Sequence, residues 1–301
     1  MKFLDADAVG ALGPAGAVRA ITDALRGGLD PATDPPRAAV GVSHGQLLLM
    51  PSEGPTAAGV KVATIAPDNP AHGLPRIQGI YLLFDRETLA LRAVLDGTAL
   101  TTLRTPAVSV AAVLPRLPDR PLRVAVIGAG PQAIGHATTL GAVRPLAGTT
   151  YLVRDPSRTT LDALRLGSAQ SDEALRTADV VVCATSARSP LFDSILLRDD
   201  AVVVAIGSHE PDARELDAPL LGRSTVVVED VPTALREAGD VVLAIAEGAL
   251  GVADLVPMRN VVTGAVTLPA DRPLIFKSVG MSWQDLVVAE AVARAAADRR
   301  A

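Results

Sequence analysis

A glycine-rich turn between an apolar run and a helix-forming segment constrains the fold of this chain more than any other feature. The apolar run spans Arg123 to Ile127, and the helix-forming segment spans Gln132 to Val143. The turn follows the pattern G-x-G-x-x-A and consists of Gly128, Ala129, Gly130, Pro131, Gln132 and Ala133. A strand, this turn and a helix make the first βα unit of a Rossmann-type, dinucleotide-binding domain.

Three positions of this turn have separate physical roles in such a domain. Gly128 permits the tight turn, Gly130 lets the backbone come close to a pyrophosphate, and Ala133 keeps the helix near the strand. The amides at the N-terminus of the helix have no partners within the helix and can hold an anion. We therefore expect the turn to bind a nicotinamide dinucleotide, and the protein to be an oxidoreductase.

Further apolar runs extend this α/β pattern toward the C-terminus. Their continuous apolar character predicts strands of a doubly wound parallel sheet that is covered on both faces. The predicted strands span Thr149 to Val153, Val180 to Ala184, Val202 to Ile206 and Thr225 to Val228. We predict a further helix from Ser157 to Leu166.

The first hundred residues have a different pattern, which is typical of a mixed α+β domain. Apolar residues at helical spacing predict a helix from Ala15 to Leu25. Short apolar runs between proline and glycine turns predict strands. These strands span Gln46 to Met50, Gly59 to Ile65 and Ile80 to Phe84.

The prolines and the last helix define the expected domains. Pro115, Pro118 and Pro121 break a helical stretch, Leu100 to Leu114, just before the first dinucleotide strand. The final predicted helix, Trp283 to Arg299, has apolar residues at helical spacing and is expected to pack on the first domain. We therefore expect a substrate-binding and dimerisation domain of residues 1–115 with 280–301, and a dinucleotide-binding domain of residues 116–279.

Composition and charge exclude several classes of function. Hydrophobic residues make up 49% of the chain and aromatic residues only 2%, so the interior is built mainly of Ala, Val and Leu. The net charge is -5 and no stretch is rich in Lys or Arg, so we expect no nucleic-acid partner. Acids stand where a signal peptide would be apolar, and no apolar run is long enough to cross a membrane. We expect a cytoplasmic protein.

The cysteine and the scattered histidines predict no metal site. Cys183 is the only cysteine and lies in an apolar run, so we expect a buried strand residue rather than a nucleophile. His44, His72 and His136 are each expected to be structural or solvent-facing. No cluster of these residues has the spacing of metal ligands.

The residues after the second predicted strand bear on the choice of cofactor. NAD-dependent enzymes usually place an acid here that holds both ribose hydroxyls, but this chain has Val153 at that position. Arg154, with Ser157 or Arg158 beside it, could instead pair with a 2′-phosphate. We therefore expect NADP(H) in preference to NAD(H), although Asp155 could face the ribose if the strand ends elsewhere.

Three basic side chains are conspicuous in the first domain. Arg37 follows a double proline, Lys61 lies inside an apolar strand, and Arg104 lies in the helical stretch that precedes the prolines. A buried lysine needs an anion beside it, and a substrate carboxylate would meet that need. A structural salt bridge or an exposed position on an edge strand would also explain Lys61.

Several spaced motifs resemble those of the ornithine cyclodeaminase and mu-crystallin family, in the same order over nearly the whole chain. In the first domain they are Gly59-Val60-Lys61 to Asn69, Gly73-Leu74-Pro75, Leu95-Asp96-Gly97, and Leu100-Thr101 with Arg104-Thr105. After the glycine-rich turn they are Ala184-Thr185-Ser186, Gly207-Ser208 with Pro211-Asp212, Arg214-Glu215-Leu216, and Lys277-Ser278-Val279-Gly280 with Asp285.

This resemblance implies a homodimer whose first domain provides both the substrate site and the subunit contact. Family members include cyclodeaminases, alanine dehydrogenases and cyclic imino-acid reductases. In those relatives the positions of Arg37, Lys61 and Arg104 hold the carboxylate of a small substrate, and we add Met50 to the substrate-binding residues. The positions assigned to the cofactor are Thr185, Ser186, Ser278, Val279 and Gly280.

One position departs from the cyclodeaminases of this family. Those enzymes place a catalytic aspartate two residues after the glycine that ends a strand, and here His209 stands two residues after Gly207. Reduction of a preformed C=N bond needs hydride delivery, carboxylate binding and one proton donor, but not that acid. His209 could donate the proton or only line the pocket.

The sequence therefore favours an NAD(P)H-dependent reductase of cyclic imino acids such as pyrroline-2-carboxylate or piperideine-2-carboxylate. Its candidate catalytic residues are Lys61, Arg104 and His209. The alternatives are an ornithine cyclodeaminase, an alanine-type amino-acid dehydrogenase, and a protein without activity that binds the cofactor and a small carboxylate.

Overall fold

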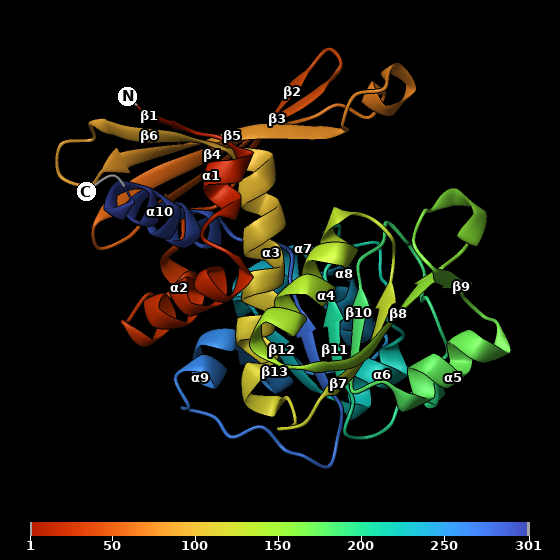
Figure 1. Cartoon of the computed structure of the whole chain (residues 1–301). Coiled ribbons are helices and arrows are strands. Elements are labelled where there is room, and N and C mark those ends of the chain that lie inside the picture. The colour runs from red at the N-terminus through yellow and green to blue at the C-terminus, as the bar shows by residue number, and fades with distance from the viewer. Residues whose placement is uncertain (1, 300–301) are drawn as a thin grey trace. The chain divides into compact units, whose positions relative to one another are not determined.

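The computed structural model describes residues 2–299 and divides into two compact units. Unit 1 consists of Met1–Val108 and Gly280–Ala301, and unit 2 is the continuous segment Ser109–Val279. The boundary falls inside α3 (Gly97–Val113), ahead of the three prolines. Each unit is built around a sheet of its own (Figure 1).

Unit 1 contains a mixed sheet, sheet A, with six strands within residues 2–299. The strand order is β1-β6-β5-β4-β3-β2, with β1 parallel to β6 and all other neighbours antiparallel. The strands predicted from the sequence are confirmed as parts of β3, β4 and β5, and the other three are additional. Their bounds are β1 (Lys2–Leu4), β2 (Ala38–Val42), β3 (Gly45–Glu53), β4 (Ala57–Ile65), β5 (Ile77–Asp85) and β6 (Leu91–Asp96).

Helix α10 (Ser282–Asp298) covers one face of sheet A. It packs on β3, β4 and β5, with α2 (Pro14–Arg26) and α1 (Ala6–Gly10) beside it (Figure 1). This confirms that the last helix packs on the first part of the chain. Alternate residues of β4 point to the covered face, so Lys61 is buried there, whereas Val60 and Val62 are half-buried on the opposite face.

Unit 2, described along its whole length, contains sheet B with eight strands, all parallel. The strand order is β13-β12-β14-β11-β10-β7-β8-β9. All the strands predicted for this part are confirmed, whereas β9, β13 and β14 are additional. The bounds are β7 (Leu122–Ile127), β8 (Leu146–Val153), β9 (Ala163–Arg165), β10 (Val180–Cys183), β11 (Val202–Ala205), β12 (Thr225–Val228), β13 (Leu255–Pro257) and β14 (Leu274–Lys277).

Helices cover both faces of sheet B, which confirms the doubly wound fold. Helix α4 (Pro131–Val143) packs on β7, β8 and β10. Alternate strand residues form a buried cluster with residues of α5, α6, α7 and α8, to which α4 contributes nothing, so α4 lies on the other face. The bounds of the remaining helices are α5 (Ala169–Thr177), α6 (Ala218–Arg223), α7 (Val231–Glu237), α8 (Gly239–Ala246) and α9 (Met258–Val262).

The helix predicted from Ser157 to Leu166 is wrong. Asp155 accepts hydrogen bonds from the amide and hydroxyl of Ser157, which starts a short 3-10 turn, η4 (Pro156–Arg158), instead of a helix. Strand β9 then pairs with the end of β8. The helix of this segment is α5, and it begins later because Ser168 caps its first turn by accepting a hydrogen bond from the Ser171 amide.

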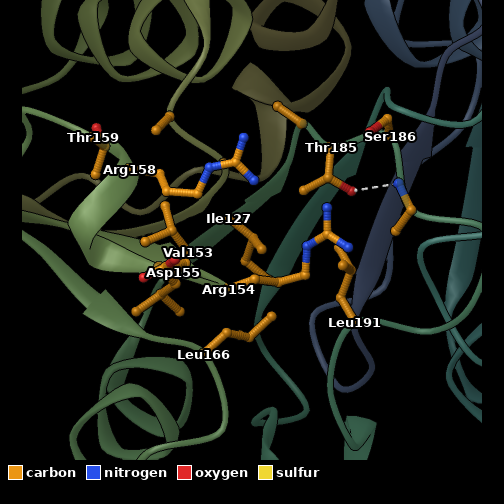
Figure 2. A pocket seen from close by; sticks show the side chains of 15 residues that line it. Ile127, Val153, Arg154, Asp155, Arg158, Thr159, Leu166, Thr185, Ser186 and Leu191 are labelled. Atoms are coloured by element: carbon orange, nitrogen blue, oxygen red, sulfur yellow. Dashed lines mark hydrogen bonds between the residues drawn. The ribbon is translucent and has the colours of Figure 1, made fainter.

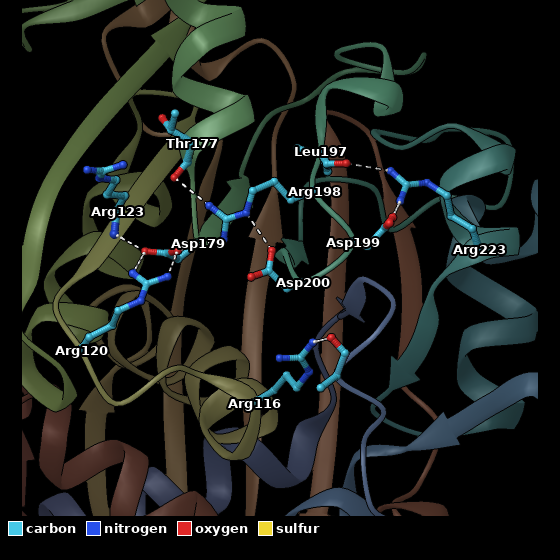
Figure 3. Close-up of polar contacts among 11 residues, drawn as sticks. Arg116, Arg120, Arg123, Thr177, Asp179, Leu197, Arg198, Asp199, Asp200 and Arg223 are labelled. Atoms are coloured by element: carbon cyan, nitrogen blue, oxygen red, sulfur yellow. Dashed lines mark hydrogen bonds and ion pairs between the residues drawn. The ribbon is translucent and has the colours of Figure 1, made fainter.

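Asp179 joins the N-terminal ends of three neighbouring strands in sheet B (Figure 3). Its buried carboxylate accepts two hydrogen bonds from Arg120, at 2.9 and 2.8 Å, one from the Arg123 amide and one from Arg198. Burial acts to raise the pKa of Asp179, but these bonds outweigh it and hold the pKa at about 2. The strands β7, β10 and β11 therefore start from one charged anchor.

Three further features of residues 2–299 concern the cysteine, metal-binding groups and membrane-spanning helices. Cys183 is buried in β10, as expected, and burial raises the pKa of its thiol. No group of His, Cys, Asp and Glu residues between 2 and 299 is arranged to hold a metal ion. None of the helices in that range combines the length and apolar character needed to span a membrane.

Candidate active site

A pocket of about 650 Å³ opens at the carboxyl ends of β7, β8 and β10 (Figure 2). From β7 the chain continues to β8 and β9 on one side, and to β10 and the remaining strands on the other. The pocket therefore lies at the topological switch point of sheet B, where doubly wound proteins bind nucleotides. The residues assigned to the cofactor that line it are Gly128, Ala129, Arg154, Arg158, Thr185 and Ser186.

The backbone around the glycine-rich turn fits a dinucleotide. Gly128 has φ +126°, and a Cβ there would lie 2.5 Å from the carbonyl oxygen of Ala184, so a side chain would push the ends of β7 and β10 apart. A Cβ on Gly130 would meet no atom within 4 Å, which leaves this backbone open to a pyrophosphate. Gly130 is also the N-cap of α4, and no described side chain caps that helix. Its first amides can therefore hold an anion.

The end of β8 places two arginines and one acid at the pocket. Arg154, Asp155 and Arg158 all line it, and Figure 2 shows both guanidinium groups among the lining side chains. The Asp155 carboxylate accepts hydrogen bonds from Ser157, which lower its pKa, and lies 3.7 Å from Arg165. Ser157 is thus engaged with Asp155 and is not among the residues that line the pocket.

Glu215 fixes the position of Thr185, which lines the pocket at the end of β10. Its buried carboxylate accepts hydrogen bonds from the amide and hydroxyl of Thr185, at 2.9 and 2.7 Å, and from the amide of Gly207 at 2.7 Å. Burial raises the pKa of Glu215. Asp240 accepts from the Glu215 amide and pairs with Lys277, whose ammonium also donates to the Ser208 carbonyl. A buried ionic network thereby joins the ends of β10 and β11.

The cofactor residues predicted near the end of β14 divide between the two units. Ser278 and Val279 both donate to Glu229, a buried acid at the end of β12, at 2.8 Å. Gly280 belongs to unit 1, and a Cβ there would lie 3.1 Å from two nitrogens of the Arg104 guanidinium. Gly280 therefore packs against a candidate substrate-binding residue.

His209 lies in the loop after β11 and is exposed within the single chain. The preceding residue, Ser208, is buried, and its hydroxyl donates to the carbonyl of Ala213. The two acids of this loop, Glu210 and Asp212, both pair with Arg188. The loop thus carries an imidazole at an exposed position, and its two carboxylates form surface ion pairs with Arg188.

In unit 1, Lys61 and Arg104 meet one buried acid, Asp285. The Lys61 ammonium lies 2.9 Å from Oδ2 of Asp285, and Nε of Arg104 donates to Oδ1 at 3.3 Å. Nη1 of Arg104 also donates to Oε1 of Gln284 at 2.6 Å. All four residues are at least nine-tenths buried. Helix α10 thus contributes the acid and the amide, while β4 and α3 contribute the two cations.

Neighbouring strands place two further side chains beside Lys61. Met50 on β3 and Tyr81 on β5 are its direct cross-strand partners, and both are buried. Opposed residues in antiparallel strands share a face, so these three side chains lie on the face that α10 covers. The Tyr81 hydroxyl has no hydrogen-bond partner among residues 2–299, and burial, with the charges of Asp285 and Asp34, raises its pKa.

Cations outnumber acids around Lys61. Burial lowers the pKa of Lys61 to about 8, and the charges of Arg104 and Arg37 lower it too, whereas Asp285 raises it. Arg37 is half-buried in the segment before β2. Because two buried cations, Lys61 and Arg104, share the single carboxylate of Asp285, the cluster is suited to a second carboxylate from outside the chain.

Sequence reasoning missed Asp285 as the partner of Lys61, although a signal was present. Asp285 stands three and four residues before Val288 and Ala289, which places it on the apolar stripe of the last helix. An acid on a buried stripe needs a cation, just as a lysine in an apolar strand needs an anion. The structural salt bridge considered for Lys61 therefore exists, together with the excess of positive charge.

Comparison with known proteins shows the family to which the chain belongs. The sequence profile of the ornithine cyclodeaminase/mu-crystallin family matches residues 15–300. A Delta(1)-pyrroline-2-carboxylate/Delta(1)-piperideine-2-carboxylate reductase of Azospirillum brasilense is 33% identical over 266 residues, which cover 85% of this chain and 83% of the relative.

Two solved structures have the same fold over nearly the whole chain. The Thermococcus litoralis Delta(1)-pyrroline-2-carboxylate reductase in complex with NADH and L-proline superposes with a TM-score of 0.87 at 26% identity, covering 99% of this chain and 98% of that one. An archaeal alanine dehydrogenase dimer with bound NAD gives 0.86 at 26% identity, covering 100% and 98%. The chain belongs to the ornithine cyclodeaminase/mu-crystallin family.

Proposed function

We propose that the protein is an NAD(P)H-dependent reductase of cyclic imino acids with a five- or six-membered ring, such as pyrroline-2-carboxylate or piperideine-2-carboxylate. The observation that carries the proposal is the buried cluster of Lys61, Arg104 and Asp285, in which cations exceed acids. Two relatives that are 33% identical over most of the chain are named as reductases of such imines.

Different residues of the chain bind the substrate carboxylate, exclude water and donate the proton in this reaction. Lys61 and Arg104, with Arg37, bind the substrate carboxylate and so fix the carbon of the neighbouring C=N bond. When bound, the reduced nicotinamide supplies the hydride for that carbon. The buried faces of Met50 and Tyr81 limit water around the carboxylate. His209 is the candidate donor of the proton to the ring nitrogen.

The loop after β11 favours reduction over cyclodeamination. Cyclodeamination begins with oxidation of a free amine, and an adjacent carboxylate stabilises the cationic intermediate. Here an imidazole stands at the position of that acid, and Glu210 and Asp212 pair with Arg188. Once the ring nitrogen carries its proton, either from His209 or from solvent before binding, the iminium carbon accepts hydride without such a carboxylate.

For the cofactor, we assign a preference for NADP(H). Arg154 and Arg158 are the two cations that line the pocket at the end of β8, and either can pair with a 2′-phosphate. The acid that would otherwise bind ribose hydroxyls, Asp155, already accepts two hydrogen bonds from Ser157.

We assign a homodimer formed through the open face of sheet A. That face carries rows of apolar cross-strand neighbours: Leu49, Val62 and Ile80 form one row, and Val60, Leu82 and Val94 form another. All six side chains are half-buried or exposed in the single chain. If a second copy of the chain places the same face of its sheet A against this one, both apolar faces become buried. The archaeal alanine dehydrogenase of the same fold is a dimer.

The decisive test compares two reactions of the full-length protein. One incubation contains pyrroline-2-carboxylate with NADPH or NADH, and the other contains ornithine with NAD+, and both are followed for proline and ammonia. We expect rapid loss of NADPH absorbance and formation of proline in the first, and neither proline nor ammonia in the second. Efficient release of ammonia from ornithine would make the protein a cyclodeaminase instead.

A further inference from the structure

The buried acid Asp285 lies between two groups that the proposed reaction requires. Each of its oxygens has a different cation: Oδ2 accepts from Lys61 and Oδ1 from Arg104. The side chain of Asp285 is fully buried. A residue from strand β4 and one from helix α3 therefore meet at one carboxylate of α10, which fixes the separation of the two cations.

We propose that Asp285 is a positioning residue that holds Lys61 and Arg104 as one rigid pair and keeps the Lys61 amine charged for binding a substrate carboxylate. The proposal rests on the proposed function, because it assigns the two cations to the substrate. It gives Asp285 no contact with the reacting atoms.

Several charged or titratable groups surround Lys61. Those that face it are Asp285 on α10, Arg104 on α3, Tyr81 on β5 and Arg37 in the segment before β2, and the charges of Asp34 and Glu290 act on the adjacent Tyr81. Burial and both arginines favour the neutral amine, and Asp285 is the largest influence that favours the ammonium. With Asp285 in place the pKa of Lys61 is already as low as about 8. Loss of this acid would lower the pKa of Lys61 further, so a larger fraction of the amine would be neutral between pH 7 and 8.

The helix that carries Asp285 holds this acid in a fixed position. Asp285 stands in the first turn of α10, where the helix dipole favours a negative charge. Asp34 fixes this end of the helix by accepting a hydrogen bond from the Trp283 amide at 2.9 Å. The neighbouring Gln284 accepts a hydrogen bond from Nη1 of Arg104. One turn of α10 therefore orients the guanidinium through two hydrogen bonds. A fixed guanidinium loses less entropy when it binds a carboxylate.

The experiment measures carboxylate binding apart from turnover. Pyrrole-2-carboxylate, a planar carboxylate that cannot accept hydride, is titrated calorimetrically into the NADPH-loaded protein between pH 6 and 9.5. In the unaltered protein we expect affinity to fall as pH rises through about 8, where Lys61 loses its proton. In Asp285→Asn the fall should move at least about one unit lower, which makes binding at pH 8 roughly fivefold weaker or worse.

Matched variants separate charge from folding. Asp298→Asn removes an acid from the exposed C-terminal end of the same helix, and it should leave the pH profile unchanged. Lys61→Arg keeps a cation that does not titrate in this range, so its binding should not fall near pH 8. This second variant tests the assignment even if Asp285→Asn does not fold.

The outcomes distinguish the inference from the function on which it rests. Equal weakening of binding by Asp285→Asn at every pH, or a fall near pH 8 that persists in Lys61→Arg, would overturn the role of Asp285. Failure of the unaltered protein to bind the probe would overturn it as well. Normal, pH-dependent binding of the probe without reduction of any cyclic imine would instead remove the proposed function and leave the role of Asp285 in carboxylate binding intact.

Discussion

The ammonium of Lys61 lies 2.9 Å from the carboxylate of Asp285, although 224 positions separate the two residues in the sequence. Neither group is stable alone in an apolar interior, because each would carry an uncompensated charge. Their pairing explains why a lysine is tolerated in a buried strand and an aspartate on the buried stripe of a helix. Mutation of either residue therefore leaves the other with an uncompensated buried charge.

Truncation of either cation should lower the activity with the imine and leave the affinity for the cofactor unchanged. Lys61→Ala and Arg104→Ala remove a buried partner of Asp285 and a ligand of the substrate carboxylate, so kcat/KM for the imine should fall by about 100-fold or more. NADPH affinity, measured by fluorescence titration, should stay within about twofold of normal, since the glycine-rich turn lies in unit 2. Arg86→Ala, which breaks an exposed pair with Glu53, serves as the control and should change neither quantity. Loss of NADPH binding in the two buried variants would contradict their assignment.

Cofactor preference should depend on Arg154. Because its guanidinium lines the pocket at the end of β8, Arg154→Ala should weaken NADPH by about tenfold or more and NADH by much less. The ratio of kcat/KM values for the two cofactors reports the change. Arg176→Ala on the exposed side of α5 is the matched control. Equal losses for NADPH and NADH would show that Arg154 does not bind a 2′-phosphate.

The stability of unit 2 should depend on pH through His136. This buried imidazole contacts the Gln132 carbonyl and the Ser109 hydroxyl, and burial lowers its pKa from 6.5 to about 4. The unfolded chain binds the proton at higher pH than the folded chain does, so stability is full above pH 6.5 and is lost as pH falls toward 4. The loss should reach roughly 3 kcal/mol.

Denaturant unfolding between pH 4 and 7 measures this effect. His136→Gln removes the titrating group and should flatten the dependence of the unfolding midpoint on pH, even if it lowers the midpoint overall. His44→Gln, at an exposed position, should keep the slope of the unaltered protein. An unchanged slope in His136→Gln would assign the acid sensitivity to other groups.

A charge on the open face of sheet A should prevent dimerisation. Val62→Lys places an ammonium in the centre of an apolar row between Leu49 and Ile80, which costs several kcal/mol if a second copy covers it. Sedimentation velocity at micromolar concentration should show a dimer for the unaltered chain and a monomer for the variant. Ile195→Lys, at a highly exposed site in unit 2, should remain dimeric. A monomeric unaltered chain would refute the assembly.

Asp179 should contribute to stability and not to catalysis. Asp179→Ala leaves Arg120 and Arg198 without their shared acid and frees the Arg123 amide, so the free energy of unfolding should fall by ~3 kcal/mol. Urea denaturation measures the loss, and kcat and KM of the folded fraction should not change. Asp199→Ala breaks a largely exposed pair with Arg223 and should cost much less. A large fall in kcat for Asp179→Ala would contradict a purely structural role.

The sequence predicted the parts of the fold whose signals are local. The glycine-rich turn, the buried strands of sheet B and the last helix each carry their signal within a few residues. Strand β9 lacked such a signal because three residues cannot show a periodicity, and its pairing with β8 depends on a turn held by Asp155. Strand β14 occupies a place between β11 and β12 that only the finished sheet defines.

The candidate site was predictable to the same extent. Lys61 and Arg104 are conspicuous because their charge conflicts with their apolar surroundings, and both meet in the structure. Glu215 and Asp240 gave no such signal, since each lies in an ordinary polar loop or at the start of a helix. Their role emerges only when the ends of several strands come together around Thr185 and Lys277.

The division of unit 1 between the two ends of the chain has a consequence during synthesis. Residues 1–108 leave the ribosome first, but the helix that covers their sheet is made last. Unit 2 is one continuous segment and can complete its core while the first segment waits. Until α10 is synthesised, Lys61 and Arg104 lack their acid and the apolar side chains around them stay exposed, so the nascent N-terminal segment can complete its core only after unit 2 has been made.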